Sequence, residues 1–294
     1  MRTNEQILDR MAEDLMLRGL ATRTQQTYLT CSRLFLNWGG CPAETMDEEN
    51  IRAYLNHLIT KKELSASTVN IYSSALRFLF AITLGRNLNY RKIPRLKQGR
   101  KLPEILTRSE IVRIFNHAST LRNKAVLMTV YGAGLRLSEV CKLKVGDIDS
   151  ESMCIFVCGK GNKDRYTLLS QTNLEVLREY WKSYNPVHPD GWLFLNADGS
   201  KQVHWRTIET AFSSAAQHAG ISKKVSLHTL RHCFATHLLE DGADIYRIKQ
   251  LLGHSSIQST TVYLHLQTNF ISELVSPLDT ISKNAGKQAE GGGC

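Results

Sequence analysis

The chain has 294 residues, of which 42% are hydrophobic and 22% charged, and it carries a formal net charge of +10. These values are typical of an ordinary folded protein of about two domains, and they argue against a mainly disordered, collagen-like or fibrous chain. A positive excess in such a protein serves solubility or binding to a polyanion, so it concerns partners rather than fold.

The first ninety residues predict four helices, each opened by a polar side chain. Thr3 and Gln6 form a capping box before the first helix, and Thr45 with Glu48 is expected to open the third. The fourth helix ends at Gly85. The apolar positions expected along the first three helices are Ile7, Met11, Leu15, Tyr28, Leu34, Phe35, Trp38, Ile51, Tyr54, Leu55 and Leu58. We therefore expect residues 1–90 to form a small all-helical domain.

Most of the excess charge follows this domain in one short segment. Residues 91–101, RKIPRLKQGRK, hold six Lys/Arg and no Asp/Glu. Pro94 and Gly99 interrupt the segment, and it has little apolar surface to bury, so we interpret residues 91–104 as an extended basic linker.

Residues 105–282 are expected to form a second domain, mainly α with a small β-sheet. Thr107 and Glu110 form a capping box at its start. MCIFVC and RYTLLS flank the turn sequence GKGNKD, which predicts a β-hairpin within residues 153–170. Further helical patterns cover residues 172–183, 204–219, 227–240 and 244–252. Residues 283–294 are glycine-rich and are expected to be a disordered tail.

The sequence predicts a cytoplasmic protein without membrane association. Its first residues are charged and lack the apolar core of a signal peptide, and the longest apolar run, near residues 78–84, is far shorter than the roughly 20 residues that span a bilayer. The seven cysteines are irregularly spaced, as free thiols are. Cys154 and Cys158 would lie about 13 Å apart on one strand face, too far to share a metal ion.

Four segments of the second domain place cationic or hydrogen-bonding side chains beside a turn or a helix cap. They contain Arg136 in YGAGLRLSEV, Lys160 in GKGNKDR, His228 and Arg231 in HTLRHCFATH, and His254 and Tyr263 in LGHSSIQSTTVYLH. Taken singly, each has an ordinary explanation, such as a helix-surface ion pair of Arg136 with Glu139. His228 and His232 have metal-ligand spacing, but no third ligand lies nearby, so we expect neither a metal nor a cofactor.

Together these residues indicate phosphoryl transfer. Two guanidiniums can bind phosphate oxygens and stabilise the charge of a transition state without a metal ion. A tyrosine can form a covalent intermediate that divides one difficult displacement into two easier ones.

The ordered set resembles the tyrosine recombinases, also called the phage integrase family. GLRLSE is followed by the lysine of GKGNK 24 positions after its arginine, then by H-x-L-R-H, by LGH, and by a tyrosine nine residues after that histidine. The resemblance covers the second domain almost throughout. The first domain is more loosely similar to the family's helical, SAM-like core-binding domain, through RGLATRTQQTY. In length the chain is similar to simple Xer-like and transposon or integron-type members.

The resemblance implies a role for each motif residue. Tyr263 would attack the scissile phosphate, form a 3'-phosphotyrosyl link and release a 5'-hydroxyl. Arg136 and Arg231 would clamp the non-bridging oxygens, and Lys160 would be the general acid that protonates the leaving 5'-oxygen.

The resemblance assigns the histidines and the glutamate to the same site. His228 would hydrogen-bond the phosphate and is a candidate acceptor of the tyrosine proton, while His254 would donate to a phosphate oxygen. Glu139 and His232 would support these side chains rather than react.

The resemblance also implies an assembly on double-stranded DNA. Four protomers would hold two duplexes and exchange strands through a Holliday junction without ATP. The segment TNFISELVSPLDTI carries an apolar stripe of Phe270, Leu274, Leu278 and Ile281. This stripe would pack on its own domain or, as in the family, dock on a neighbouring protomer to build a homotetramer.

The candidate DNA contacts lie in the first domain and the linker. A helical domain joined by a cationic linker to a catalytic domain suits a clamp around a duplex, with Lys/Arg on phosphates. The candidates are Arg23, Thr68, Arg91, Lys92, Arg95, Lys97, Arg100 and Lys101, and Gln25 and Asn70 also lie near helix starts. Arg23, Gln25, Thr68 and Asn70 could each equally be a cap or a solvated side chain.

The leading hypothesis is a site-specific recombinase for integration, excision or transposition of a mobile element. A type IB topoisomerase shares the chemistry, although the Xer-like spacing and the C-terminal stripe argue against it. A DNA-binding regulator with an idle active site is the third reading.

Overall fold

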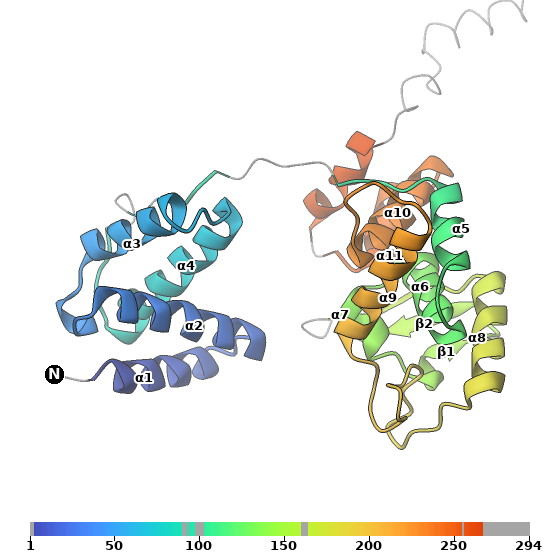
Figure 1. Ribbon diagram of the computed structural model, residues 1–294, viewed down its shortest axis with the longest axis horizontal. Coiled ribbons are helices and arrows are strands. Elements are labelled where there is room, and N and C mark those ends of the chain that lie inside the picture. Colours follow the sequence, from blue (N-terminus) through green and yellow to red (C-terminus); the bar gives the residue numbers. More distant parts are fainter. Residues whose placement is uncertain are drawn as a thin grey trace, which may run out of the picture. The chain divides into compact units, whose positions relative to one another are not determined.

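The computed structural model describes residues 3–89, 93, 95–97, 103–159, 164–254 and 256–266. The chain divides into two compact units, Met1–Arg100 (unit 1) and Lys101–Cys294 (unit 2) (Figure 1). Both are mainly helical, and unit 2 also holds a small antiparallel sheet. The expected fold class is therefore confirmed.

Unit 1 contains the four expected helices. They are α1 (Asn4–Leu17), α2 (Thr22–Gly39), α3 (Glu48–Thr60) and α4 (Ala66–Phe78), with a 3-10 turn at Ala43–Thr45 and a π-helical turn at Leu79–Thr83. The capping box of Thr3 and Gln6 is present. The helices enclose an apolar core in which Phe35 meets the rings of Tyr54 and Phe80 edge-on.

Two details of unit 1 differ from the sequence-based expectation. Asp47, not Thr45, caps α3, because its carboxylate accepts from two backbone N–H groups of the first turn, while the Thr45 hydroxyl donates to the Pro42 carbonyl. Leu34 and Trp38 are 45% and 42% exposed. The core-facing side of α2 is formed instead by Cys31, Ser32, Phe35 and Leu36, whose spacing follows the helical period.

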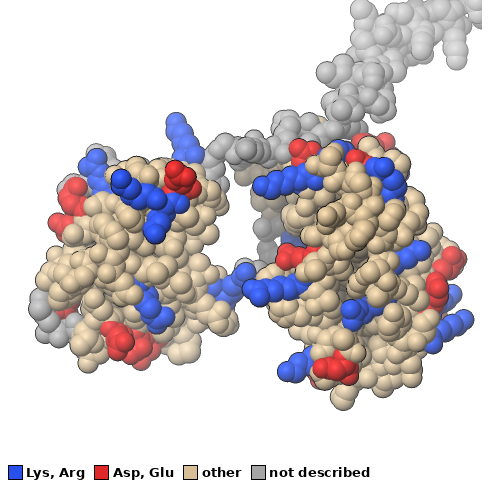
Figure 2. Space-filling model, in the orientation of Figure 1, with Lys and Arg blue, Asp and Glu red and all other residues tan. Residues whose placement is uncertain are grey.

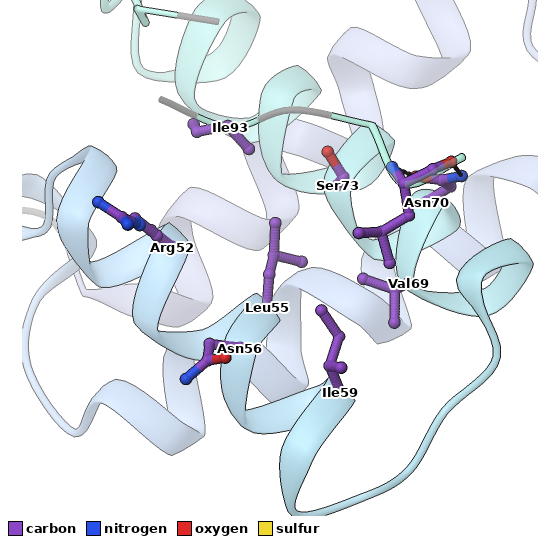
Figure 3. A pocket seen from close by; sticks show the side chains of 9 residues that line it. Arg52, Leu55, Asn56, Ile59, Val69, Asn70, Ser73 and Ile93 are labelled. Atoms are coloured by element: carbon purple, nitrogen blue, oxygen red, sulfur yellow. Dashed lines mark hydrogen bonds between the residues drawn. The ribbon is translucent and has the colours of Figure 1, made fainter. Parts of the chain in front are cut away.

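Part of the basic segment is bound to unit 1. Ile93 is 1% exposed within the core, and Arg77 donates to its carbonyl. Asn70 donates to the Leu96 carbonyl at 3.0 Å and accepts from the Leu96 N–H at 2.9 Å. Figure 3 shows Asn70, Ser73 and Ile93 around a pocket whose other side is formed by α3. The Asn70 amide therefore holds the segment at Leu96 against α4.

Unit 2 is built around α6 (Leu121–Ala133), a helix with buried residues on several sides. The other helices among its described residues are α5 (Arg108–Asn116), α7 (Leu137–Cys141), α8 (Gln171–Tyr184), α9 (Trp205–His218), α10 (Leu227–Glu240) and α11 (Ile245–Leu252), with 3-10 turns at Val145–Asp147, Ile257–Ser259 and Thr261–Leu266. The helical patterns expected from residue 172 onward correspond to α8, α9, α10 and α11, and the capping box of Thr107 and Glu110 is present.

The sheet of unit 2 confirms the expected hairpin and adds a strand. β2 (Cys154–Val157) and β3 (Arg165–Leu168) pair antiparallel, with Cys154 opposite Leu168. The short β1 (Ile148–Asp149) pairs with the other edge of β2. Two residues are too few for an alternating pattern, so β1 could not be recognised in the sequence.

Among the residues that the structure describes, no helix is both long and apolar enough to cross a membrane.

Candidate active site

The predicted catalytic and supporting residues that the structure describes come together at one place in unit 2. They are supplied by α7 and the residue before it, by α10, by the loop after α11, and by the 3-10 turn at Thr261–Leu266. These residues are Arg136, Glu139, His228, Arg231, His232, His254 and Tyr263. Lys160, the proposed general acid, lies outside the described residues.

Arg136 and Glu139 form an ion pair at the start of α7. The Arg136 N–H donates to Glu139 Oε2 at 2.8 Å, and its Nη1 donates to Oε1 at 2.7 Å. The Arg136 side chain is 35% exposed, whereas that of Glu139 is 5% exposed. The carboxylate therefore fixes the direction of a guanidinium that still reaches solvent, where a phosphate could meet it.

Arg231 lies deeper than Arg136. It is 1% exposed, and its guanidinium donates to the carbonyls of Gly134 and Leu252 at 2.5 and 2.6 Å. Its Nη1 lies 3.7 Å from Glu139 Oε2. Burial, and then the charge of Arg136, lower the pKa of Arg231 to about 10, so it is still a cation at neutral pH.

Gly134 ends α6 with a φ of +61°, a conformation that favours glycine. A Cβ at this position would lie 2.4 Å from the Phe234 ring. Glycine is thus required for the turn that brings the Gly134 carbonyl to Arg231 and places Arg136 two residues later.

A third arginine of this site was not recognised in the sequence. Arg165, the first residue of β3, binds both carboxylate oxygens of Glu139, with Nη1 at 3.0 Å from Oε1 and Nη2 at 2.9 Å from Oε2. We refer to Arg136, Arg165 and Arg231 around Glu139 as the arginine cluster. The only sequence signal of Arg165 was its position directly after the turn GKGNKD, where it was interpreted as part of a strand.

The C-terminal end of α11 binds all three members of the arginine cluster. The Leu251 carbonyl accepts from Arg165 at 2.6 Å, the Leu252 carbonyl accepts from Arg231, and the Gly253 carbonyl accepts from Arg136 at 3.5 Å. Unpaired carbonyls at a helix C-terminus carry partial negative charge, which stabilises nearby cations. Three consecutive carbonyls therefore hold three guanidiniums that come from different elements.

Tyr263 is buried against this cluster, with 2% of its surface exposed. Its hydroxyl lies 3.1 Å from His232 Nδ1. Burial raises the pKa of Tyr263, although Arg231 and Arg136 oppose this effect. Burial, and then the neighbouring His228, lower the pKa of His232 to about 4. At neutral pH the phenol is therefore protonated and the imidazole neutral, and the phenol donates to Nδ1 when the imidazole proton lies on Nε2.

His228 packs on His232, whose Nδ1 is the hydrogen-bond partner of the Tyr263 hydroxyl. Its ring packs edge-on against the ring of His232, with 4.5 Å between the centroids. Burial, followed by the charges of Arg231 and Arg136, lowers the pKa of His228. His232, which the resemblance assigned to a supporting role, is the residue within hydrogen-bond distance of the Tyr263 hydroxyl.

His254 directly follows the α11 C-terminal turn. Its Nδ1 lies 2.9 Å from the hydroxyl oxygen of the buried Thr260, and its ring stacks on that of Tyr263. Burial, followed by Arg231 and Arg136, lowers the pKa of His254 to about 4, so the ring is neutral at pH 7. When Thr260 donates to Nδ1, the ring proton lies on Nε2, which can then donate to a phosphate oxygen.

No group of three or more His, Cys, Asp or Glu suited to a metal ion occurs in the described part of the chain. The site is instead rich in fixed cations and neutral imidazoles. Such an arrangement can bind an anion and stabilise added negative charge on its oxygens.

The candidate DNA contacts of unit 1 are placed only in part. Arg23, Arg95 and Lys97 are exposed. The Thr68 hydroxyl is 2.9 Å from that of Ser65, within the cap of α4. Arg91, Lys92, Arg100 and Lys101 lie outside the described residues, as does the C-terminal stripe of Phe270, Leu274, Leu278 and Ile281. On the face shown in Figure 2, Lys/Arg and Asp/Glu are interspersed over the surface of each unit.

Two family models match the chain. One, described as the phage integrase family, covers residues 104–269, and the other, described as the phage integrase N-terminal SAM-like domain, covers residues 7–90. A putative integrase/recombinase, y4qK, of Sinorhizobium fredii is 38% identical over 278 residues, which are 94% of this chain and 89% of the relative. Tyrosine recombinase XerA of Pyrococcus horikoshii is 31% identical over 96% of this chain and 97% of its own length.

Solved structures share the fold. XerH site-specific recombinase in a post-cleavage complex with its palindromic difH substrate is 23% identical, with a TM-score of 0.74 over 87% of this chain and 80% of that one. A lambda integrase tetramer bound to a Holliday junction is 20% identical, with a TM-score of 0.73 over 89% of this chain and 77% of that one. At these identities, the likeness shows the architecture.

Proposed function

This chain belongs to the phage integrase family, whose relatives are tyrosine recombinases, and on that basis we propose that Tyr263 is the nucleophile with which it cleaves and rejoins DNA at specific sites. The observation that carries the assignment is the arrangement around Tyr263. Its hydroxyl lies within hydrogen-bond distance of a neutral imidazole, and two guanidiniums are fixed beside it by Glu139 and the end of α11. Metal- and ATP-independent strand transfer needs these groups.

The first step transfers the phosphoryl group to the enzyme. The Tyr263 oxygen attacks phosphorus, a 3'-phosphotyrosyl bond forms, and the bond to the 5'-oxygen breaks. The tyrosine proton passes to the imidazole pair of His232 and His228. By its motif position, Lys160 protonates the leaving 5'-oxygen. A 5'-hydroxyl from a second duplex then attacks the phosphotyrosyl group, releases Tyr263 and joins the strands without ATP.

Arg136, Arg231 and His254 bind the non-bridging oxygens during both steps. Arg136 reaches solvent, whereas Arg231 and Tyr263 are 1% and 2% exposed. Binding of DNA therefore has to open the site before the scissile phosphate can contact all of these groups. This requirement confines the reactive tyrosine to the complex with DNA.

The assembly that fits this chemistry is a homotetramer on two double-stranded DNA sites. A related fold has been solved as a tetramer on a Holliday junction. The stripe of Phe270, Leu274, Leu278 and Ile281 is the segment we assign to docking on a neighbour. Residues 1–90 and residues 105–282 form the two parts of a DNA clamp. Residues 91–104 join them, with Ile93 and Leu96 held against the first part. The protein acts in the cytoplasm on a mobile element or a related target.

A covalent adduct tests this function. The full-length chain is incubated with duplex fragments tiled across the DNA that flanks its gene, and SDS-stable protein–DNA adducts are collected and sequenced. We expect adducts at one inverted repeat with the unmodified chain and none with Tyr263→Phe. Relaxation of plasmids of any sequence would support a topoisomerase instead, and tight binding without an adduct would support a regulator.

A further inference from the structure

Every nitrogen of the Arg165 guanidinium donates a hydrogen bond to another residue of the chain. Nη1 and Nη2 form a two-pronged contact with the two oxygens of Glu139, and Nε donates to the Leu251 carbonyl at 2.6 Å. The side chain is 7% exposed. It therefore differs from Arg136, which is 35% exposed at the same carboxylate. Arg165 is placed to act on Glu139 rather than on a ligand.

The need for such a residue follows from the charge of Glu139. This carboxylate orients Arg136, but it also lies within 3.7 Å of Arg231, so it places a negative charge beside the two cations that bind phosphate. With Arg165 present, three guanidiniums surround one carboxylate, and the local charge is +2. Without it, the local charge would be +1, and an incoming phosphate would meet a less positive site.

Burial favours the neutral form of Glu139 and by itself raises its pKa. Hydrogen bonds from Arg165, and then from the Arg136 backbone, more than reverse this effect and lower the pKa to about 2. The carboxylate therefore remains ionised at neutral pH and continues to hold Arg136.

The chain leaves room for Arg165 at the end of α11. Gly253 has a φ of +61°, and a Cβ there would lie 2.9 Å from Arg165 Cδ and 3.2 Å from its Nη1. The next residue is His254. Arg165 thus passes directly against the turn from which His254 extends, and it joins β3, the start of α7 and the end of α11 at one point.

We propose that Arg165 is a positioning residue of strand cleavage: it does not bind the scissile phosphate, but it neutralises Glu139, so that this carboxylate can orient Arg136 without opposing the anion. The proposal rests on the proposed function of the site. A residue that only connected three elements would affect stability alone, so its loss would not slow cleavage in a variant that is folded and bound to DNA.

The test compares single-turnover cleavage rates on a nicked duplex that carries the mapped site, at saturating protein. Arg165→Met should reduce the rate about 100-fold, in the range found for loss of one preorganised charge-stabilising group. Adding Glu139→Gln to Arg165→Met restores the local charge to +2 and should recover at least tenfold of the lost rate. Arg165→Lys retains the charge but not the two-pronged contact with Glu139, and it should cleave faster than Arg165→Met. Arg178→Met, an exposed arginine on α8, is the matched control and should cleave normally.

Thermal unfolding and DNA affinity are measured for every variant, so that loss of folding is separated from loss of rate. The proposal is overturned if Arg165→Met cleaves at the normal rate, or if the double variant is no faster than Arg165→Met although both are folded. Arg165→Lys preserves the cation and provides the comparison if Arg165→Met does not fold. In that case the proposal is contradicted if Arg165→Lys and the single variant Glu139→Gln both cleave at the normal rate, because neither the geometry of Arg165 nor the charge of Glu139 would then affect cleavage. Absence of any adduct with the unmodified chain would instead reject the proposed function.

Discussion

In the described part of unit 1, every buried polar side chain is neutral, namely Ser32, Ser73 and Thr83. In the described part of unit 2, by contrast, the largest fully buried side chain is Arg231, and Glu139 is buried beside it. A buried charge costs several kcal/mol unless it is paired and hydrogen-bonded. Unit 2 meets this requirement through the arginine cluster and the carbonyls at the end of α11. The difference indicates that unit 2 buries whole charged side chains for a reaction, while the charged side chains described in unit 1 keep part of their surface exposed.

Among the variants that test this difference between unit 1 and unit 2, the largest effect is expected at Arg231. Arg231→Ala should lower the rate of adduct formation by about 10³ to 10⁵-fold, because it removes a cation from the charge that develops on the phosphate. DNA affinity should change little, since Arg231 is 1% exposed and contributes little to the outer surface. Adduct formation is measured by gel, and affinity by a filter or mobility assay.

Arg231→Lys is the matched variant for this measurement. It retains a cation near the Gly134 and Leu252 carbonyls, and it should remain folded while losing the two-pronged geometry. If Arg231→Ala lost DNA binding and cleavage in parallel, the division between a reacting unit and a binding unit would be wrong.

The contrast between the units also explains what could be predicted from the sequence. The helices of unit 1 and the hairpin of unit 2 follow local periodicity and caps, and the ordered motif placed Arg136, Arg231 and Tyr263 in one site. Arg165 could not be found in this way. Its partners lie 26 and 86 residues away in the chain, so its burial depends on how β3 packs against α7 and α11, and local alternation carries no such information.

The misplaced cap of α3 has a similar cause. Thr45 and Glu48 have the spacing of a capping box, but Asp47 and Asn50 have it too. The 3-10 turn at Ala43–Thr45, held in part by Asn4 at the start of α1, decides between them. A contact almost forty residues distant therefore fixes a boundary that short-range rules leave open.

A second prediction concerns acid sensitivity, which should arise in unit 2. The pKa of His232 and that of His254 are lowered to about 4 in the folded chain, against an ordinary value of 6.5. The unfolded chain therefore binds more protons between these values, and the free energy of unfolding should fall as the pH is lowered from about 6.5 to 4. We expect a loss of about 1 to 3 kcal/mol, measured by urea unfolding at pH 7.5 and 4.5.

The double variant His232→Gln/His254→Gln tests the source of this loss. It should show a smaller difference between the two pH values, because neither residue can then take up a proton. Glu139, with a pKa lowered to about 2, loses its contribution only as the pH falls below its ordinary value of 4.5. An unchanged difference in the double variant would place the acid-sensitive groups elsewhere.

The smallest effect is expected at the exposed charges of unit 1. Arg95 and Lys97 are exposed, yet their segment is fixed to α4 because Asn70 binds both backbone groups of Leu96. Held in this way, the two cations are presented at a constant position on unit 1 rather than on a free linker. If both contact DNA phosphates, Arg95→Gln/Lys97→Gln should reduce the slope of log affinity against log salt concentration by about 2, at about 0.9 per phosphate contact.

A matched control separates position from net charge. Lys61→Gln/Lys62→Gln removes the same charge from another exposed site of unit 1, and we expect it to change the slope less. Cleavage at saturating protein should be normal in both double variants, since neither touches the arginine cluster. Equal changes of slope in the two would mean that unit 1 attracts DNA through its overall charge, whereas a slower cleavage step with Arg95→Gln/Lys97→Gln would mean that this segment also governs the chemistry of unit 2. The first result would contradict the inference that Asn70 positions Arg95 and Lys97 for DNA. The second would contradict the inference that unit 1 binds DNA and unit 2 alone carries out the reaction.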